Sequence, residues 1–212
     1  NVVMRLLICT VLIMPFVLQA QNFINPGSTW KYLDDGSDLT GTNWTTVAFN
    51  DAGWASGNAE LGYGDGDENT TVSYGSDGSN KYVTTYFRKT FNVADPNAIG
   101  QLSLEIVRDD GAVVYINGTE VYRTNMPGGA ITASTFSDGT VAWPNEDDWH
   151  TAVASASLLV TGNNVVAVEI HQSDASSSDI SFDFEMSGTA ANSVNITRGP
   201  YLQKATQSSM VV

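Results

Sequence analysis

The feature that most constrains the fold is a strict alternation of apolar and polar residues near the end of the chain. Apolar residues occupy every second position of one segment, Ile180-Ser181-Phe182-Asp183-Phe184-Glu185-Met186. Successive side chains of a strand point to opposite faces, so this pattern predicts a half-buried β-strand. Residues 102–106 repeat the alternation. Residues 165–170 are continuously apolar, as expected of a central strand covered on both faces.

Turn signals separate further β-rich runs. Asn117-Gly118 lies between the runs 112–116 and 119–122, and a type I′ hairpin turn needs positive φ at both central positions, which these residues tolerate. Another strand is predicted over 82–91, and no stretch between Trp30 and Met186 has a helical period. About eight strands between turns predict an all-β fold, an antiparallel jelly-roll β-sandwich.

Charge limits the classes of partner. The 212 residues include 9 basic and 23 acidic ones, a formal net charge of −14. Such a field repels phosphate backbones and anionic lipid, so nucleic acid is not expected as a partner. Neutral polysaccharides and divalent cations remain compatible with it. The alternative is that the acidity only keeps an exported protein soluble.

The first twenty residues differ from the rest. Met4-Arg5 precedes an apolar run over 6–18, and a small residue, Ala20, then precedes Gln21. This order is typical of a signal peptide, with cleavage expected after Ala20, so a secreted or periplasmic protein without a membrane segment is predicted. The sole cysteine, Cys9, lies within this segment. The mature chain is therefore expected to fold without disulfides.

Five blocks resemble the galactose-binding-like jelly-roll domains that bacteria attach to secreted enzymes. In chain order the blocks are residues 51–54, 61–66, 85–91, 109–118 and 162–169. Similar blocks occur in the N-terminal sugar-binding domain of β-galactosidase-type glycoside hydrolases. The resemblance covers roughly residues 28 to 188, and a jelly-roll domain is expected over 21–188. It implies a fold and leaves the ligand open.

A second, shorter resemblance follows. Small residues over 189–195 indicate a linker, and 196–212 begins Ile-Thr-Arg-Gly-Pro-Tyr-Leu-Gln. This stretch resembles the first strands of the fibronectin-like domain that precedes the catalytic domain in purple acid phosphatases. The resemblance implies a truncated domain over 196–212 and a parent metallophosphoesterase. In that family a dinuclear metal centre hydrolyses phosphate monoesters. None of its ligand motifs occurs here, so the dinuclear metal is expected only in a missing catalytic domain.

Calcium is the metal that the sequence itself raises. Residues 65–69 begin like an EF-hand loop, but Thr70 stands where that loop needs glycine and Ser76 where it needs glutamate. Loop carboxylates of another kind could still hold one structural ion, with Asp109, Asp110 and Asp179 as candidate ligands. The alternative is a capped turn in which the carboxylates accept backbone N–H bonds.

Aromatic residues in polar surroundings are candidates for stacking on sugar rings. Trp54, Trp143 and Trp149 fit this description, and Glu146 and Asp147 lie close to the last two to bond hydroxyl groups. The alternative is that each tryptophan caps an end of the core. Trp30 and Trp44 are expected in the core itself.

The function that these patterns favour is a non-catalytic accessory module of a secreted multidomain hydrolase, with carbohydrate as a candidate ligand. Its expected partner is the downstream catalytic domain. The alternative is a structural spacer or stabilising domain without any ligand. The two histidines, His150 and His171, have no second histidine at ligand spacing, so hydrogen-bonded structural roles are predicted for both.

Overall fold

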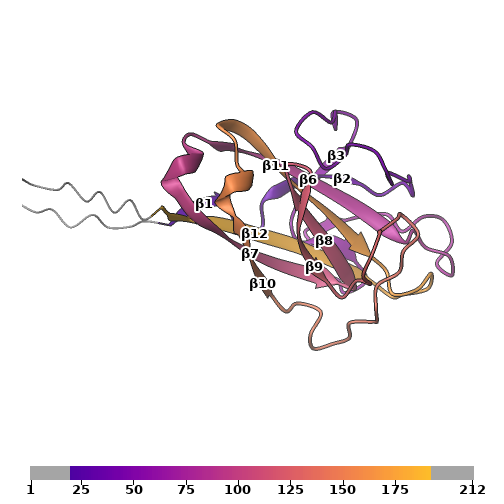
Figure 1. Cartoon of the computed structure of the whole chain (residues 1–212). Coiled ribbons are helices and arrows are strands. Elements are labelled where there is room, and N and C mark those ends of the chain that lie inside the picture. Colours follow the sequence, from indigo (N-terminus) through magenta and orange to yellow (C-terminus); the bar gives the residue numbers. More distant parts are fainter. Residues whose placement is uncertain (1–19, 192–212) are drawn as a thin grey trace, which may run out of the picture.

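A computed structural model describes residues 20–191, which form two packed β-sheets (Figure 1). The predicted all-β sandwich is confirmed, and the described residues contain no α-helix. The elements are β1 Gln21–Ile24, β2 Thr29–Leu33, β3 Ala55–Asn58, β4 Leu61–Tyr63, β5 Thr70–Thr71, β6 Thr84–Val93, η1 Pro96–Ala98, β7 Ile99–Asp109, β8 Gly111–Ile116, β9 Thr119–Thr124, β10 His150–Ser155, η2 Ala156–Leu158, β11 Gly162–His171 and β12 Ile180–Ala190.

Sheet A runs in the order β10-β7-β12-β4-β5, and β1 also pairs with β12. Its register places Ser181 of β12 opposite both Asp109 of β7 and Gly62 of β4. Residues opposite one another in an antiparallel pair share a face. The outward-pointing positions of three strands therefore meet at this end of sheet A. The short β4–β5 pair is parallel, a departure from the fully antiparallel arrangement that was expected.

Sheet B runs in the order β3-β2-β6-β11-β8-β9, with β6 and β11 at its centre. The continuously apolar segment of β11 is buried on both faces, as predicted. One face packs against sheet A and the other is covered by the connection between β2 and β3. Asn117 and Gly118 form the turn between β8 and β9 with φ of 50° and 90°, which confirms the predicted hairpin.

The main core lies between the sheets. The ring of Phe182 stacks on Phe87 with centroids 4.2 Å apart and meets Trp30 edge-on at 4.9 Å. Trp30 is buried here, as expected. Trp44 is also buried, but it lies in a second cluster with Tyr86 and Ala167 on the outer face of sheet B. The sandwich therefore has two apolar clusters, one between the sheets and a smaller one on the outer face of sheet B.

The described range bears on the expected boundaries. Strand β12 continues to Ala190, two residues into the range expected as a linker. Gly188 is small because Phe23 and Ile99 lie where its Cβ would be, and it belongs to the sheet. The predicted signal segment 1–19 and the phosphatase-like segment 196–212 lie outside the described residues. Within 20–191, no helix has the length and hydropathy to cross a membrane.

Candidate functional site

Carboxyl groups gather at one end of the sandwich, on loops that leave sheet A and sheet B. We call this group the acidic end. It comprises side chains from the turn between β3 and β4, the loop after β4, the end of β7, the long connection between β9 and β10, and the connection between β11 and β12: Glu60, Asp65, Asp67, Glu68, Asp109, Glu146, Asp147 and Asp179. Figure 1 shows the β9–β10 connection running outside the two sheets.

The acidic end contains three groups of three carboxylates. Within each group, one oxygen of every carboxylate lies within 4.8 Å of the others. Asp65, Glu146 and Asp179 form the first group. Glu60 and Asp147 meet Asp67 in the second. The third, Asp65 with Asp67 and Glu68, lies within one short loop, where Glu68 accepts the N–H groups of Asp65 and Gly66 at 3.1 Å each. The first two groups therefore join segments that are far apart in the sequence.

Asp109 is the most deeply buried carboxyl of the acidic end. It is fully buried, and neither carboxyl oxygen accepts a hydrogen bond from an N–H or O–H donor among the described atoms. Its pKa is raised to about 10, chiefly by burial and also by the adjoining carboxyls of Asp110 and Asp179. Without a compensating cation, the folded chain therefore holds a proton on Asp109 at neutral pH.

Two further carboxyls titrate near neutrality. The pKa of Asp65 is raised to about 6, chiefly by burial and to a smaller extent by the nearby charges of Asp179 and Glu146. The pKa of Glu60 is raised to about 7, again chiefly by burial. In both groups the main cause is removal of the charged form from solvent, and repulsion from neighbouring carboxylates is a smaller one.

Asp110 has a different role from its neighbour. Its carboxylate accepts the backbone N–H of Val141 at 2.8 Å, the backbone N–H of Ser173 at 2.6 Å and the hydroxyl of Ser177 at 3.0 Å. Asp110 thereby ties two loops to the end of the sandwich. The carboxylate thus accepts backbone N–H bonds, but from distant loops and not from a capped turn of its own. The sequence did not distinguish Asp110 from Asp109.

The basic side chains near the acidic end donate to backbone carbonyls and not to its carboxylates. Lys81 lies over the ring of Tyr63 and donates to the carbonyls of Ser177 and Ser178 at 2.5 and 2.7 Å. Buried Arg108 donates from Nη1 to the carbonyl of Asp110 at 2.8 Å. The ion pairs found among residues 20–191 involve Arg88, Arg123 and His171. None of them neutralises a carboxylate of the acidic end.

The predicted sugar-binding residues separate into two places. Trp143 is 82% exposed and Trp149 is 40% exposed, and both lie on the same connection as Glu146 and Asp147. Trp54 is only half-exposed and packs edge-on against Phe49, with centroids 5.8 Å apart, on the outer face of sheet B. Four of the five residues therefore lie on one connection, and Trp54 lies on another part of the molecule.

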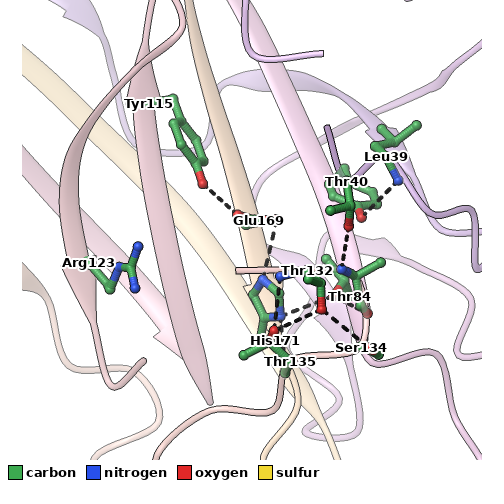
Figure 2. A network of polar contacts seen from close by, with 12 residues as sticks. Leu39, Thr40, Thr84, Tyr115, Arg123, Thr132, Ser134, Thr135, Glu169 and His171 are labelled. Atoms are coloured by element: carbon green, nitrogen blue, oxygen red, sulfur yellow. Dashed lines mark hydrogen bonds and ion pairs between the residues drawn. The ribbon is translucent and has the colours of Figure 1, made fainter. Parts of the chain in front are cut away.

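A second polar network, which the sequence did not indicate as a unit, lies on the outer face of sheet B (Figure 2). Glu169 accepts the hydroxyl of Tyr115 at 2.7 Å and lies 3.4 Å from Nε2 of His171. The other ring nitrogen of His171 lies 2.7 Å from the carbonyl of Thr135 and 3.1 Å from the hydroxyl of Thr84. These contacts confirm a hydrogen-bonded structural role for His171.

A shallow pocket of about 340 Å³ opens beside this network. It is lined by three segments, Gly36–Asp38, Asn80–Thr84 and Ala133–Ser134. The hydroxyl of Thr40 accepts the backbone N–H of Ala133 at 2.9 Å, which joins two of the loops around it. His150, in contrast, lies at the edge of sheet A, where burial and the charge of Arg108 lower its pKa. Its Nε2 atom is buried without a hydrogen-bond partner among the described residues, so the structure does not show the hydrogen-bonded role predicted for His150.

Comparisons with known proteins bear on the fold. No protein-family model and no curated protein sequence matches the chain. Among solved structures, it is similar to Bacteroides uniformis beta-glucuronidase 2, with 17% identity and a TM-score of 0.51 over 80% of this chain and 18% of the enzyme. A Ruminococcus gnavus β-glucuronidase gives 12% identity and a TM-score of 0.50 over 85% of this chain and 31% of the enzyme.

A third similar structure is a β-glucuronidase of glycoside hydrolase family 2, with 14% identity and a TM-score of 0.50. It is matched over 82% of this chain and 18% of its own length. The chain therefore spans less than a third of these three enzymes. At such low identity the likeness confirms the fold, a β-sandwich found as one part of glycoside hydrolases. None of the three is a phosphatase, so they lend no support to the resemblance noted for residues 196–212.

Proposed function

We propose that this chain contributes a non-catalytic accessory domain to a larger secreted hydrolase, and that its acidic end presents a carbohydrate-binding surface. The observation that carries the proposal is the exposed pair Trp143 and Trp149 on one connection with Glu146 and Asp147. Exposed tryptophan faces stack on sugar rings, while carboxylates accept bonds from sugar hydroxyls. The likeness to a part of larger glycosidases supports the accessory role.

The acidic field defines the class of glycan. The acidic end contains eight carboxyls, two of them on the connection that carries the two tryptophans, and the chain as a whole has a formal net charge of −14. Anionic polysaccharides would be repelled by this surface. Neutral polysaccharides would pay no such cost, so they are the proposed ligands.

Two enzymes are candidates for the parent. A glycoside hydrolase is supported by the fold comparisons. A purple acid phosphatase-type metallophosphoesterase is supported only by the sequence of residues 196–212. Reading the gene beyond codon 212 separates them. Gly-Asp and Gly-Asn-His-Glu motifs downstream indicate the phosphatase, whereas a glycosidase parent continues without them.

Affinity electrophoresis in neutral soluble polysaccharides tests the binding surface. We expect the wild-type chain to be retarded, and Trp143→Ala and Trp149→Ala to lose most of the retardation. Phe136→Ala is the matched control, because Phe136 is a 39% exposed aromatic residue on the same connection but lies outside the segment of the two tryptophans. Binding that survives both tryptophan substitutions would remove this surface from consideration.

A spacer without a ligand is the competing function. The tight Asp110 tethers favour it, because they would rigidify the domain equally well without any glycan. Deleting residues 21–188 from the longer protein should then lower its yield or melting temperature and leave the KM for a small substrate unchanged. Absence of glycan binding at millimolar concentrations, together with that result, would favour the spacer.

A further inference from the structure

We propose that Asp65, Glu146 and Asp179 bind one Ca²⁺ ion that holds the connection between β9 and β10 against the end of the sandwich. The three carboxylates come from separate segments, the loop after β4, the β9–β10 connection and the residue before β12. They converge until their oxygens lie within 4.8 Å of one another. This proposal does not depend on whether the domain binds a glycan.

The first argument is electrostatic. Three like charges at this separation repel one another, most strongly where solvent is limited, and Asp179 is only 8% exposed. The nearby cations Lys81 and Arg108 donate to backbone carbonyls instead of to these carboxylates. A divalent cation bound between the three carboxylates would attract each of them and offset their mutual repulsion. It would thereby hold the three segments together.

The second argument is independent of the cluster. Asp109 is fully buried, and neither of its carboxyl oxygens accepts a hydrogen bond from an N–H or O–H donor among the described atoms. Its carboxyl instead lies against the carboxyls of Asp110 and of Asp179, a member of the proposed site. A buried carboxyl without a partner is costly unless a proton or a cation compensates it. An ion held by Asp179 would place positive charge beside Asp109.

The donor set selects the metal. All side-chain ligands are carboxylate oxygens, and neither His150 nor His171 is part of any of the three carboxylate groups. Zinc and copper sites use nitrogen or sulfur ligands, so they are disfavoured. Ca²⁺ accepts six to eight oxygens in variable geometry, and loop carbonyls and water can complete its shell. Mg²⁺ requires a more regular octahedron than three irregular segments provide.

Asp110 and the other carboxylate groups are excluded as ligands for stated reasons. The Asp110 carboxylate is saturated by its three hydrogen bonds. Glu68 is engaged by two backbone N–H groups. The group that contains Glu60 has two exposed members, Asp67 and Asp147. Glu60 has one buried oxygen without a hydrogen-bond partner, but none of the three members is buried as Asp179 is. The site therefore keeps only Asp179 of the three ligands that were first considered from the sequence.

Calorimetric titration of the metal-free chain with CaCl₂ is the direct test. We expect one ion to bind, with a Kd of about 0.1 to 1 mM, the range of extracellular calcium modules. Glu146→Gln should weaken the affinity at least about tenfold, because one of three charged ligands is lost. The matched control is Asp148→Asn, an exposed carboxylate two residues away that belongs to none of the three groups. Its affinity should change less than about twofold. MgCl₂ should bind more weakly than CaCl₂.

Melting temperatures in EDTA and in saturating Ca²⁺ give a second readout with opposite signs. Without calcium, Glu146→Gln relieves repulsion and should melt above the wild type. With calcium, it removes a ligand and should melt below the wild type. Equal increases in both conditions would mean that the cluster is merely repulsive, and a wild-type chain that shows no saturable Ca²⁺ binding up to about 10 mM would overturn the proposal outright.

Discussion

The carboxylate of Asp110 accepts the backbone N–H of Ser173 at 2.6 Å, and this bond ties the β11–β12 connection to the start of β8. The same carboxylate accepts the N–H of Val141, which begins the segment that carries Trp143 and Glu146. Asp110 is fully buried. Two of the three segments that form the proposed metal site, the β9–β10 and β11–β12 connections, therefore depend on the buried side chain of Asp110. Asp110 is not itself one of the proposed metal ligands.

Replacing Asp110 with asparagine is expected to loosen both loops. The amide keeps the size of the side chain but loses the charge that strengthens three hydrogen bonds, so the free energy of unfolding should fall by about 2 kcal/mol. Hydrogen exchange should increase mainly in residues 141–149 and 172–179. Asp138→Asn, in an exposed position nearby, is the control and should leave both measurements close to wild type. A uniform rise in exchange over the whole sandwich would contradict the local role.

Arg88 is expected to be essential for the connection between β2 and β3. Its guanidinium donates to Asp51 at 2.9 Å and to the carbonyls of Trp44 and Thr46, while the residue is only 1% exposed. Arg88→Met leaves these acceptors unpaired and should cost about 3 kcal/mol in urea unfolding. Lysine should not restore the loss, because it lacks the planar fork of donors.

The partly exposed pair of Arg123 and Glu120 provides the comparison for that experiment, although Arg123 also donates to the carbonyls of Pro127 and Gly129. Its nitrogen and oxygen are 2.8 Å apart, but the side chains are 20% and 39% exposed. Arg123→Met should therefore cost less than about 1 kcal/mol. If both arginine substitutions had the same cost, burial would not be the reason for the importance of Arg88.

The strands were predictable because their patterns are local. The alternation over 180–186 predicts a strand, and β12 forms there. The apolar run over 165–170 predicts a strand covered on both faces, and β11 is buried over this run. The Asn117-Gly118 hairpin follows from backbone sterics at two neighbouring residues. The end of β12 was harder to place, because Gly188 lies against Phe23 and Ile99 within the sheet and the strand continues through Thr189 and Ala190, which suggested a linker.

The site was only partly predictable because it depends on register. Nothing local in the sequence shows that Asp65 meets Glu146, since the pairing of β4 with β12 and the path of a long connection bring them together. Asp109 and Asp110 look equivalent in the sequence. They take different roles because the chain passes from β7 to β8 between them, and Asp110 turns toward the loops. Trp54 looked exposed, but Phe49 covers it.

Phe182 is expected to be among the most sensitive core positions. It has no exposed surface, and its ring contacts both Phe87 and Trp30. Phe182→Ala should lower the free energy of unfolding by about 4 kcal/mol, because the cavity lies between two sheets that cannot close over it. Phe136→Ala, at an exposed position, should cost less than about 1 kcal/mol by the same denaturant titration. A small loss at Phe182 would mean that the sheets do collapse.

Glu60 should make the metal-free chain less stable at alkaline pH. Its pKa is raised from 4.5 to about 7, chiefly by burial, and nearby carboxyls such as Asp67, Asp147 and Asp183 add to the shift while a hydrogen bond with Ser181 opposes it. Between these pH values the folded chain holds a proton that the unfolded chain has released. Stability attributable to this group therefore falls as the pH rises through that window.

Urea unfolding in EDTA at about pH 5 and pH 8 measures this effect of Glu60. Because the carboxyl is only half-buried, solvent screening reduces its contribution to about 1 kcal/mol. Glu60→Gln should shrink the difference in unfolding free energy between the two pH values by about that amount, since the neutral amide cannot titrate. Glu185→Gln, outside the acidic end, should leave the difference unchanged. If Glu60→Gln kept the full wild-type difference, the carboxyl would be ionised in the folded chain at both pH values, and the repulsion assigned to this part of the acidic end would be wrong.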